Sequence, residues 1–546
     1  MTKNGKTLTD QDDIDKRWSE YLADLYTDKN TYGPNVLTEL FKRSGADREH
    51  GRDGILLEEV KNAIRKLKDN KSPGPDDIPA ELIKAGGEPL AREVHKICCE
   101  IWETEKWPKD WCKSTIVMLP KKGNLKECGN YRSIALIPHM CKVMLNILQD
   151  RLKSALEGQI SEEQGGFRKD RSTVQQILTL RLIAEEITEK GKDLYHCFID
   201  FKKAFDSVWH DGLWASLGNL AVPEKLIRVT RSLYEQSEMA VRTGQSLGSY
   251  IKANIGSRQG DPMSPMLFIA ILEKVMERME CADMGGINIQ GEVIKDLRFA
   301  DDIDLLATSE KDLQDQMCMV HEDGESMGLH INIEKTKVLV MGSSTQAHIE
   351  ISGEMIECVE QFVYLGSLIT RNNDCSKEIQ RRIGIASSVF GSMKEIWGSQ
   401  NISLRNKLRI LDCCVFSSLL YACETWTLKK QDERRLLACE MRCYRRILKI
   451  SWTRKVKNDE VRKRVGRTST LMERIKKRKL GLFGHICRMR NERIIKLVML
   501  GMSEGVRKQG RPRRRWLDDI KDWCGVTLPE AVRMAEERRG CWRQKR

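Results

Sequence analysis

The stretch Phe299-Ala300-Asp301-Asp302 places two adjacent carboxylates inside a largely apolar segment, Leu297 to Ala307. Residues that favour β-strands stand on both sides of the tetrad: Val293, Ile294, Leu297, Phe299, Ile303, Leu305 and Leu306. The pattern predicts a β-hairpin with both acids at its tip, where a divalent cation would relieve their mutual repulsion. The tetrad does not decide this alone, because an Asp-Asp pair in a turn is often only a solvated turn.

A third acid, Asp200, ends the apolar run Leu194 to Ile199, about a hundred residues before the tetrad. Three carboxylates suffice for two Mg²⁺ ions about 4 Å apart, one lowering the pKa of an attacking hydroxyl and one steadying the leaving pyrophosphate. Carboxylate oxygens suit Mg²⁺. Asp200, Asp301 and Asp302 are therefore the predicted metal ligands and catalytic acids of a phosphoryl-transfer site.

Further motifs stand in a fixed order around these acids. They are Lys71–Pro79 (KSPGPDDIP), Ile116–Gly123 (IVMLPKKG), Asn130–Leu136 (NYRSIAL), Gln164–Arg168 (QGGFR), Gly256–Phe268 (GSRQGDPMSPMLF), Gly328–Thr336 (GLHINIEKT) and Phe362–Gly366 (FVYLG). With the Asp200 and Asp301 segments, they make the chain resemble reverse transcriptases of non-long-terminal-repeat (LINE-like) retrotransposons from about Lys71 to Thr370. Asp261 and Met263 depart from residues common in that family, and no catalytic position is lost.

The resemblance implies an α+β fold, the right-hand polymerase with fingers, a palm with an antiparallel sheet and a helical thumb, followed here by a basic helical C-terminal region. It implies an RNA-directed DNA polymerase that extends a DNA 3′-hydroxyl on an RNA template. Mg²⁺ would be the cofactor, for which Mn²⁺ can substitute, and the partners would be RNA template, DNA primer or target, and deoxynucleoside triphosphates. The rival interpretation is a catalytically silent nucleic-acid-binding remnant. A purely structural interaction protein would not explain the ordered motifs.

The resemblance also implies roles for single residues. Lys335 would protonate pyrophosphate, although the alternating residues before it also allow an ordinary lysine at a sheet edge. The nucleotide-binding set would be Lys121, Arg132, Phe201, Phe205, Arg258, Gln259 and Gly260. Lys121 and its neighbour Lys122 could equally be ordinary exposed cations, whereas the guanidinium of Arg132 could clamp phosphate bidentately.

Phe205 has two competing interpretations. By the family pattern, an aromatic five residues after the first catalytic Asp lies beneath the sugar and excludes a ribose 2′-hydroxyl. The alternative is a core aromatic. In the Gly256–Phe268 motif, Ser264 is expected to cap a helix with Pro265 at its first position, and the run from Met266 to Val275 to bury that helix.

Composition is typical of a large intracellular enzyme. The 546 residues, 40% hydrophobic, can bury several cores. Met1 to Asp13 is polar, unlike a signal peptide, and the longest apolar stretch, near Cys413 to Cys423, is shorter than the roughly 20 residues of a membrane span. The 18 cysteines show no compact repeated framework and are expected to be reduced. The expected location is the nucleus or cytoplasm, with no secretion and no membrane partner.

Positive charge is concentrated in the C-terminal part. Residues 442–515 hold 26 Lys and Arg against 5 Asp and Glu, a net of +21, whereas the whole chain carries +14. Tyr444, Trp452, Phe483 and Trp516 are interleaved with these cations. Solvated helix faces are one explanation, but charge of one sign with aromatics available for stacking favours phosphate-backbone binding.

A zinc site is not predicted. The nearest candidate ligands are Cys439, Cys443, His485 and Cys487. They lack a recognisable four-ligand spacing.

Four segments are expected: residues 1–54 as an N-terminal segment and linker with a helix near Trp18 to Tyr26, 55–370 as fingers and palm, 371–450 as a helical thumb, and 451–546 as a basic nucleic-acid-binding region. Autonomous elements of the resembled family carry an endonuclease domain ahead of the polymerase, and only about seventy residues precede the first motif here. We therefore expect a fragment or truncated copy that depends on an endonuclease supplied elsewhere.

Overall fold

The structure is a computed structural model that describes residues 7–27, 54–121, 123–244, 246–342, 346–467, 469–501, 503, 505, 509–510 and 513–538. The chain divides into two compact units. Unit 1 comprises residues 1–168, 200–282 and 318–332, and unit 2 comprises residues 169–199, 283–317 and 333–546. Each unit is described by itself below. None of the described helices is long and apolar enough to cross a membrane.

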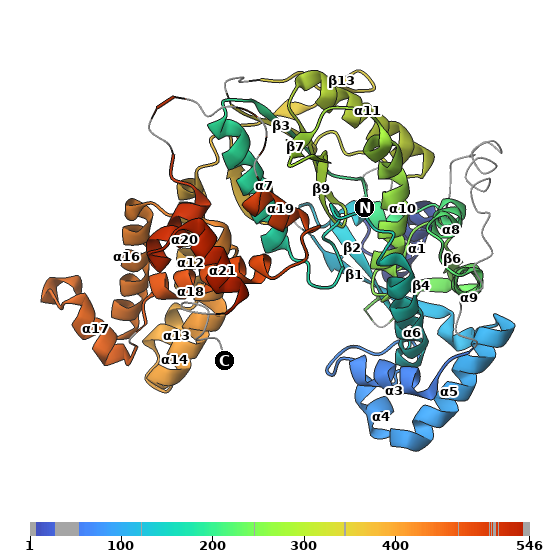
Figure 1. The fold of residues 1–546 in the computed structure, drawn as a ribbon. Helices are drawn as coiled ribbons and strands as arrows, with labels where there is room; N and C mark the ends of the chain where they lie inside the picture. The colour runs from blue at the N-terminus through green and yellow to red at the C-terminus, as the bar shows by residue number, and fades with distance from the viewer. Residues whose placement is uncertain are drawn as a thin grey trace. The chain divides into compact units, whose positions relative to one another are not determined.

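Unit 1 contains the N-terminal helix and most helices of the first half of the chain (Figure 1). Its helices are α1 (Gln11–Tyr26), α3 (Leu57–Lys66), α4 (Ala80–Ala85), α5 (Gly87–Thr104), α6 (His139–Leu156), α8 (His210–Asn219), α9 (Glu224–Gln236) and α10 (Ser264–Cys281). Asp10 caps α1 by accepting hydrogen bonds from the backbone of Asp12 and Asp13. The helix expected near Trp18 to Tyr26 is thereby confirmed.

A five-stranded sheet belongs to the same unit. Its strands are β1 (Lys113–Pro120), β2 (Tyr131–Leu136), β4 (Glu238–Thr243), β5 (Ser246–Leu247) and β6 (Ile251–Lys252). β1 pairs with β2 in antiparallel fashion, with Leu119 opposite Arg132, and with β4 in parallel. The motifs that begin at Ile116 and Asn130 therefore lie largely on β1 and β2.

The central sheet of unit 2 has the strand order β14-β11-β3-β10-β9. Its strands are β14 (Glu357–Cys358), β11 (Lys337–Met341), β3 (Leu194–Ile199), β10 (Asp302–Ala307) and β9 (Asp296–Phe299). All neighbours are antiparallel except β11 and β14. The predicted hairpin is confirmed as β9–β10, but Val293 and Ile294 belong to another strand, β8 (Glu292–Ile294), which pairs with β7 (Ile287–Ile289).

The remaining described elements are mostly helices of unit 2. They are α7 (Thr173–Glu189), α12 (Cys375–Ser392), α13 (Lys394–Gly398), α14 (Leu404–Ile410), α15 (Ser417–Leu419), α16 (Lys430–Ile447), α17 (Asn458–Val465), α18 (Leu471–Cys487), α19 (Ile494–Leu500), α20 (Trp516–Cys524) and α21 (Leu528–Glu536). The hairpins β12 (Glu350–Ile351)–β13 (Glu354–Met355) and β15 (Gln361–Tyr364)–β16 (Ser367–Thr370) also belong to unit 2, and α11 (Glu310–Ser326) runs from unit 2 into unit 1. The helical character expected for residues 371–450 is confirmed.

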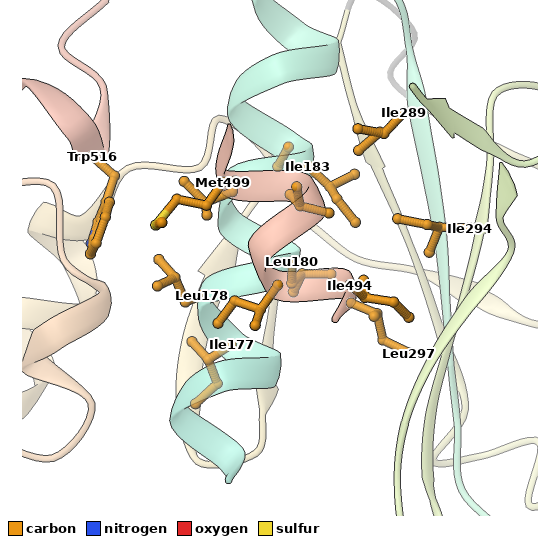
Figure 2. Close-up of a cluster of buried hydrophobic side chains, with 14 of the residues drawn as sticks. Ile177, Leu178, Leu180, Ile183, Ile289, Ile294, Leu297, Ile494, Met499 and Trp516 are labelled. Atoms are coloured by element: carbon orange, nitrogen blue, oxygen red, sulfur yellow. The ribbon is translucent and has the colours of Figure 1, made fainter. Parts of the chain in front are cut away.

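The C-terminal helices share one hydrophobic core with α7 and the central sheet (Figure 2). Ile177, Leu180 and Ile183 of α7 belong to this core. In Figure 2, Ile494 of α19 lies beside Leu297 of β9, and Met499 lies on the side of Trp516 of α20. Trp516 is fully buried. The region after residue 451 thus contributes to a core that begins at α7, because its apolar residues bury against that helix. Its role in nucleic-acid binding stays a prediction.

Candidate functional site

A two-residue turn carries the paired acids. Phe299 is opposite Asp302 in the β9–β10 ladder, so Ala300 and Asp301 form the tip. Asp301 is half-buried and Asp302 is exposed. Ala300 has φ +60°, in the left-handed region that costs a residue with a Cβ roughly 1–2 kcal/mol. Strain of this kind persists where the surrounding structure fixes the backbone, and it is common at functional turns.

The strand before Asp200 lies next to this hairpin within the unit 2 sheet. Ile199, the last residue of β3, pairs with Ile303, which directly follows Asp302. Asp200 is the next residue of the chain, and the division between the units falls between Ile199 and Asp200. On the other side of β3, Phe198 pairs with Lys337 of β11. The ends of these strands that lead to the predicted acids therefore share one edge of the sheet.

Lys335 lies in an exposed turn two residues before β11. The residues before it were expected to alternate as a strand, but they do not form one. Ile331 makes a single antiparallel bridge with Phe201, and the backbone of Asn332 donates to the carbonyl of Asp200 at 2.7 Å. The turn at residues 333–335 ends this pairing, so Lys335 is not a lysine of an edge strand.

The donor chemistry at these positions fits a hard cation, because carboxylate oxygens are the ligands that Mg²⁺ prefers. Among the residues that the structure describes, no three His, Cys, Asp or Glu side chains form a group that could hold a metal ion. Zinc candidates Cys439 and Cys443 pack in the core of the helical part of unit 2 instead, and Cys487 packs in the core around α7.

The Gly256–Gly260 loop of unit 1 is held close to neighbouring backbone. Gly260 has φ +120°, and a Cβ there would lie 2.5 Å from the carbonyl oxygen of Ala135. The carbonyl of Gln259 accepts a hydrogen bond from the backbone of Ala135 at 2.7 Å. The loop is thereby fixed to β2, the strand that carries the exposed Arg132. Only glycine fits this approach.

Arg258 does not present its charge to solvent. It is 5% exposed, its guanidinium lies 3.2 Å from Asp261 and packs over the ring of Tyr234. Burial alone would lower the pKa of Arg258, but the carboxylate of Asp261 more than offsets this and raises it. In this structure Arg258 therefore holds the loop through the buried carboxylate of Asp261. Its role in nucleotide binding stays a prediction.

The helix after this loop also starts differently from the prediction. Met263 is the N-cap residue of α10, so Ser264 is the first helical residue and Pro265 the second. The Ser264 hydroxyl donates to the carbonyl of Arg258 at 2.8 Å rather than capping the helix. The predicted burial of the run from Met266 is confirmed.

Phe205 satisfies part of both interpretations. It is half-buried, and its ring lies 4.7 Å from that of the fully buried Phe268 in α10. Its carbonyl accepts a hydrogen bond from the backbone of Ser257 at 2.7 Å. One face of the ring therefore packs on the core of unit 1, while part of the side chain stays accessible. Phe201, by contrast, is buried.

The predicted phosphate-binding cations are exposed. Lys121 follows β1, and Arg132 stands on β2 opposite Leu119. Lys122 lies outside the described residues. Arg132 thus stands on a strand of the unit 1 sheet, and Lys121 directly follows the neighbouring strand.

Two buried polar pairs near these motifs were not predicted from the sequence. Tyr26 donates a hydrogen bond from its hydroxyl to the buried carboxyl of Asp206 at 3.0 Å. On the unit 2 sheet, His196 lies 3.1 Å from Asp304, and both side chains are fully buried. Burial raises the pKa of Asp304, while His196 opposes that shift. The sequence shows His196 and Asp304 as polar residues inside two apolar strands, but this does not identify them as partners. Tyr26 and Asp206 lie outside strands and give no such signal.

Comparison with known proteins gives a consistent result over the middle of the chain. Residues 119–369 match the family described as "Reverse transcriptase (RNA-dependent DNA polymerase)". Over 421 residues the chain is 24% identical to the RNA-directed DNA polymerase from mobile element jockey of Drosophila funebris, covering 75% of this chain and 45% of that protein. It is 25% identical over 354 residues to the transposon TX1 uncharacterized 149 kDa protein of Xenopus laevis, covering 63% and 26%. The chain thus spans less than half the length of these relatives.

Solved structures resemble the chain only weakly. A Candida tropicalis apo telomerase has a TM-score of 0.36 and 15% identity, covering 52% of this chain and 59% of that one. The RNA-dependent RNA polymerase of a human picorbirnavirus has a TM-score of 0.40 and 12% identity, covering 89% and 82%. The fold is a mixed α+β architecture, and scores at this level do not define it further.

Proposed function

Residues 119–369 are a reverse transcriptase domain related to the polymerases of non-long-terminal-repeat retrotransposons, and from this premise we propose that the chain is an RNA-directed DNA polymerase. It would extend a DNA 3′-hydroxyl on an RNA template with deoxynucleoside triphosphates. The observation that carries the proposal is the β9–β10 turn with Asp301 and Asp302, paired in register with the strand that leads into Asp200. The right-hand arrangement of fingers, palm and thumb is part of this proposal.

Asp200, Asp301 and Asp302 would hold two Mg²⁺ ions, which supply the lowered pKa of the primer hydroxyl and charge compensation for pyrophosphate. Three carboxylates without a cation repel one another, so the proposal requires them to converge when metal binds. Lys335 lies where β11 enters the same sheet edge, and as an exposed ammonium it can deliver a proton to the leaving pyrophosphate. Arg132 and Lys121 would take the triphosphate.

A row of exposed cations supports a nucleic-acid partner. Arg442 and Arg446 stand four residues apart on α16, and Lys449 follows shortly after its end. Many other C-terminal cations are already engaged, as in the ion pairs Arg467–Asp412 and Arg478–Glu424. The excess charge available to phosphates is therefore concentrated on fewer residues than the sequence suggested.

Replacing Arg442, Arg446 and Lys449 together by Ala should weaken primer–template binding and reduce the slope of log affinity against log salt by about 2–3, since each lost phosphate contact removes about 0.7–0.9 from the slope. Affinity is measured between roughly 50 and 200 mM salt. The matched control replaces three exposed cations of unit 1, Arg65, Arg92 and Lys96, each paired with a nearby glutamate. Equal slopes for the two triple variants would show that the α16 row does not bind phosphate.

Phe205→Val should raise ribonucleotide incorporation relative to deoxynucleotide incorporation about a hundredfold. The reason is that relief of a clash worth about 2.8 kcal/mol corresponds to that factor. Deoxynucleotide use should fall only modestly. Single-nucleotide insertion of both sugars measures the ratio.

The competing outcome for Phe205 follows from its contact with Phe268. If packing is its only role, the cavity should cost about 3–5 kcal/mol, as for Phe→Ala, and should reduce activity with both sugars alike. A melting curve separates the two. A folded variant with unchanged sugar preference would show that Phe205 only packs in the core and does not select the sugar.

The second candidate function is a silent nucleic-acid-binding remnant. It predicts tight binding to primer–template without nucleotide addition. The exposed α16 cations fit both functions, whereas retention of all three acids together with Gln259 and Lys335 favours the polymerase. Single-nucleotide extension on an RNA template distinguishes them.

A further inference from the structure

The N-terminal helix α1 lies outside the matched segment 119–369, yet its last residue contacts the loop that carries Gln259. Tyr26 is 3% exposed. Its carbonyl accepts a hydrogen bond from the backbone of Asn254 at 2.9 Å. Its ring lies against Gly256, where an added Cβ would approach two ring carbons to 3.0 Å. Tyr26 therefore supports the Gly256–Gly260 loop through both backbone and side chain.

The hydroxyl of Tyr26 extends this support to the side chain of Gln259. It lies 3.0 Å from Asp206 Oδ1 and 3.1 Å from Ser133 Oγ. The same Asp206 oxygen accepts a long hydrogen bond of 3.5 Å from Gln259 Nε2. Asp206 is buried and follows Phe205 directly, and Ser133 follows Arg132 on β2. One hydroxyl thus links the segments that carry three of the predicted nucleotide-binding residues.

The helix is anchored at other points that do not involve Asp206. The carboxylate of Asp15 accepts hydrogen bonds from the hydroxyls of Thr243 and Ser246 in the unit 1 sheet. Trp18 packs edge-on against Tyr131 at 5.1 Å. Because α1 is held independently, loss of the Tyr26 hydroxyl alone should leave the helix in place.

We propose that Tyr26 is a positioning residue for nucleotide selection: through Asp206 it holds the Gln259 side chain and the Gly256–Gly260 loop in the conformation that receives the incoming deoxynucleotide. This rests on the proposed polymerase function. Tyr26 itself does not touch the reacting atoms. A purely structural tyrosine would affect stability and leave the kinetic constants of the folded enzyme unchanged.

The test is Tyr26→Phe in the full chain, which keeps the ring on Gly256 and removes only the hydroxyl. Loss of the hydrogen bond to Asp206 predicts a KM for deoxynucleotide roughly three- to tenfold higher, with kcat changed less than about twofold. In a Gln259→Ala background, Tyr26→Phe should add no further increase in KM, because the group it positions is gone. Full additivity in that cycle would overturn the proposal.

Asp15→Ala is the matched control, since it weakens the other anchor of α1 without touching Asp206. It should leave KM within about twofold of wild type; a rise equal to that of Tyr26→Phe would mean that any loosening of α1 suffices, and would contradict the specific role of Tyr26. Hydrogen exchange of residues 254–260 is the second readout and needs no activity. It should be faster in Tyr26→Phe than in wild type and unchanged in Asp15→Ala. A wild-type chain that adds no nucleotide would refute the polymerase proposal, whereas unchanged exchange in Tyr26→Phe would refute the positioning role.

Discussion

Asp301→Asn should reduce primer extension on RNA and DNA templates by at least a hundred- to thousandfold, the order of loss when one group that stabilises transition-state charge is removed. The substitution keeps the shape of the side chain and removes its negative charge. Asp301 is only half-buried at the tip of the β9–β10 turn, and asparagine fills the same space there. Binding of primer–template and the melting temperature should therefore stay close to wild type.

Asp315→Asn is the control for this experiment. Asp315 is exposed on α11, and the same chemical change there should leave extension unaffected. Single-turnover extension by both variants gives the comparison. If the folded Asp301→Asn chain extends primers at a rate within about threefold of wild type, the β9–β10 hairpin is not part of the catalytic site.

Asp519→Asn should lower the free energy of unfolding by about 3–5 kcal/mol, because it leaves the buried ammonium of Lys479 without its counter-ion. Lys479 Nζ lies 2.6 Å from Asp519 Oδ2, and the two side chains are 0% and 1% exposed. Lys479 Nζ also donates a hydrogen bond to the carbonyl of Trp426 at 2.8 Å. The pair joins α18 to α20, so its loss should destabilise the core shared with α7.

The loss of stability caused by Asp519→Asn should depend on pH in a defined direction. Burial lowers the pKa of Lys479 below that of a free lysine, although Asp519 opposes the shift. The unfolded chain then binds more protons than the folded one just below pH 10.5, and stability from this group rises with pH in that window. Without Asp519 the pKa of Lys479 should fall further. Asp519→Asn should therefore lower the free energy of unfolding more at pH 7 than at about pH 9.5, as measured by chemical denaturation.

Asp522→Asn provides the matched control on the same helix. Asp522 is 59% exposed, and its ion pair is with Arg514. An exposed pair contributes about 0–1 kcal/mol, so this variant should unfold nearly as wild type does. Equal losses from Asp519→Asn and Asp522→Asn would contradict a buried, stabilising Lys479–Asp519 pair.

The sequence was sufficient for features that depend on local pattern. Strand-forming residues around Asp301 predicted the β9–β10 hairpin, and the apolar run before Asp200 predicted β3. Apolar residues after Pro265 predicted the buried helix α10. In each case the period of the side chains determines which face is buried, and this can be read without knowing the partner.

Features that depend on distant partners could not be read in this way. Arg258 was expected at the nucleotide, and its burial on Asp261 depends on how Tyr234 packs. The Tyr26–Asp206 contact joins residues 180 positions apart. The cations after residue 451 suggested a separate binding region, whereas the apolar residues between them complete a core with α7. A run of charged residues indicates that one helix face is exposed to solvent, but it does not indicate what the opposite face packs against.

The most direct test is extension of a DNA primer on an RNA template by the purified full chain with Mg²⁺. We expect a DNA product that lengthens to the template end. Its synthesis should require all four deoxynucleotides and should stop when the metal is chelated. If a folded chain binds the same primer–template but adds no nucleotide, the polymerase proposal is contradicted. That result would support a catalytically silent nucleic-acid-binding protein instead.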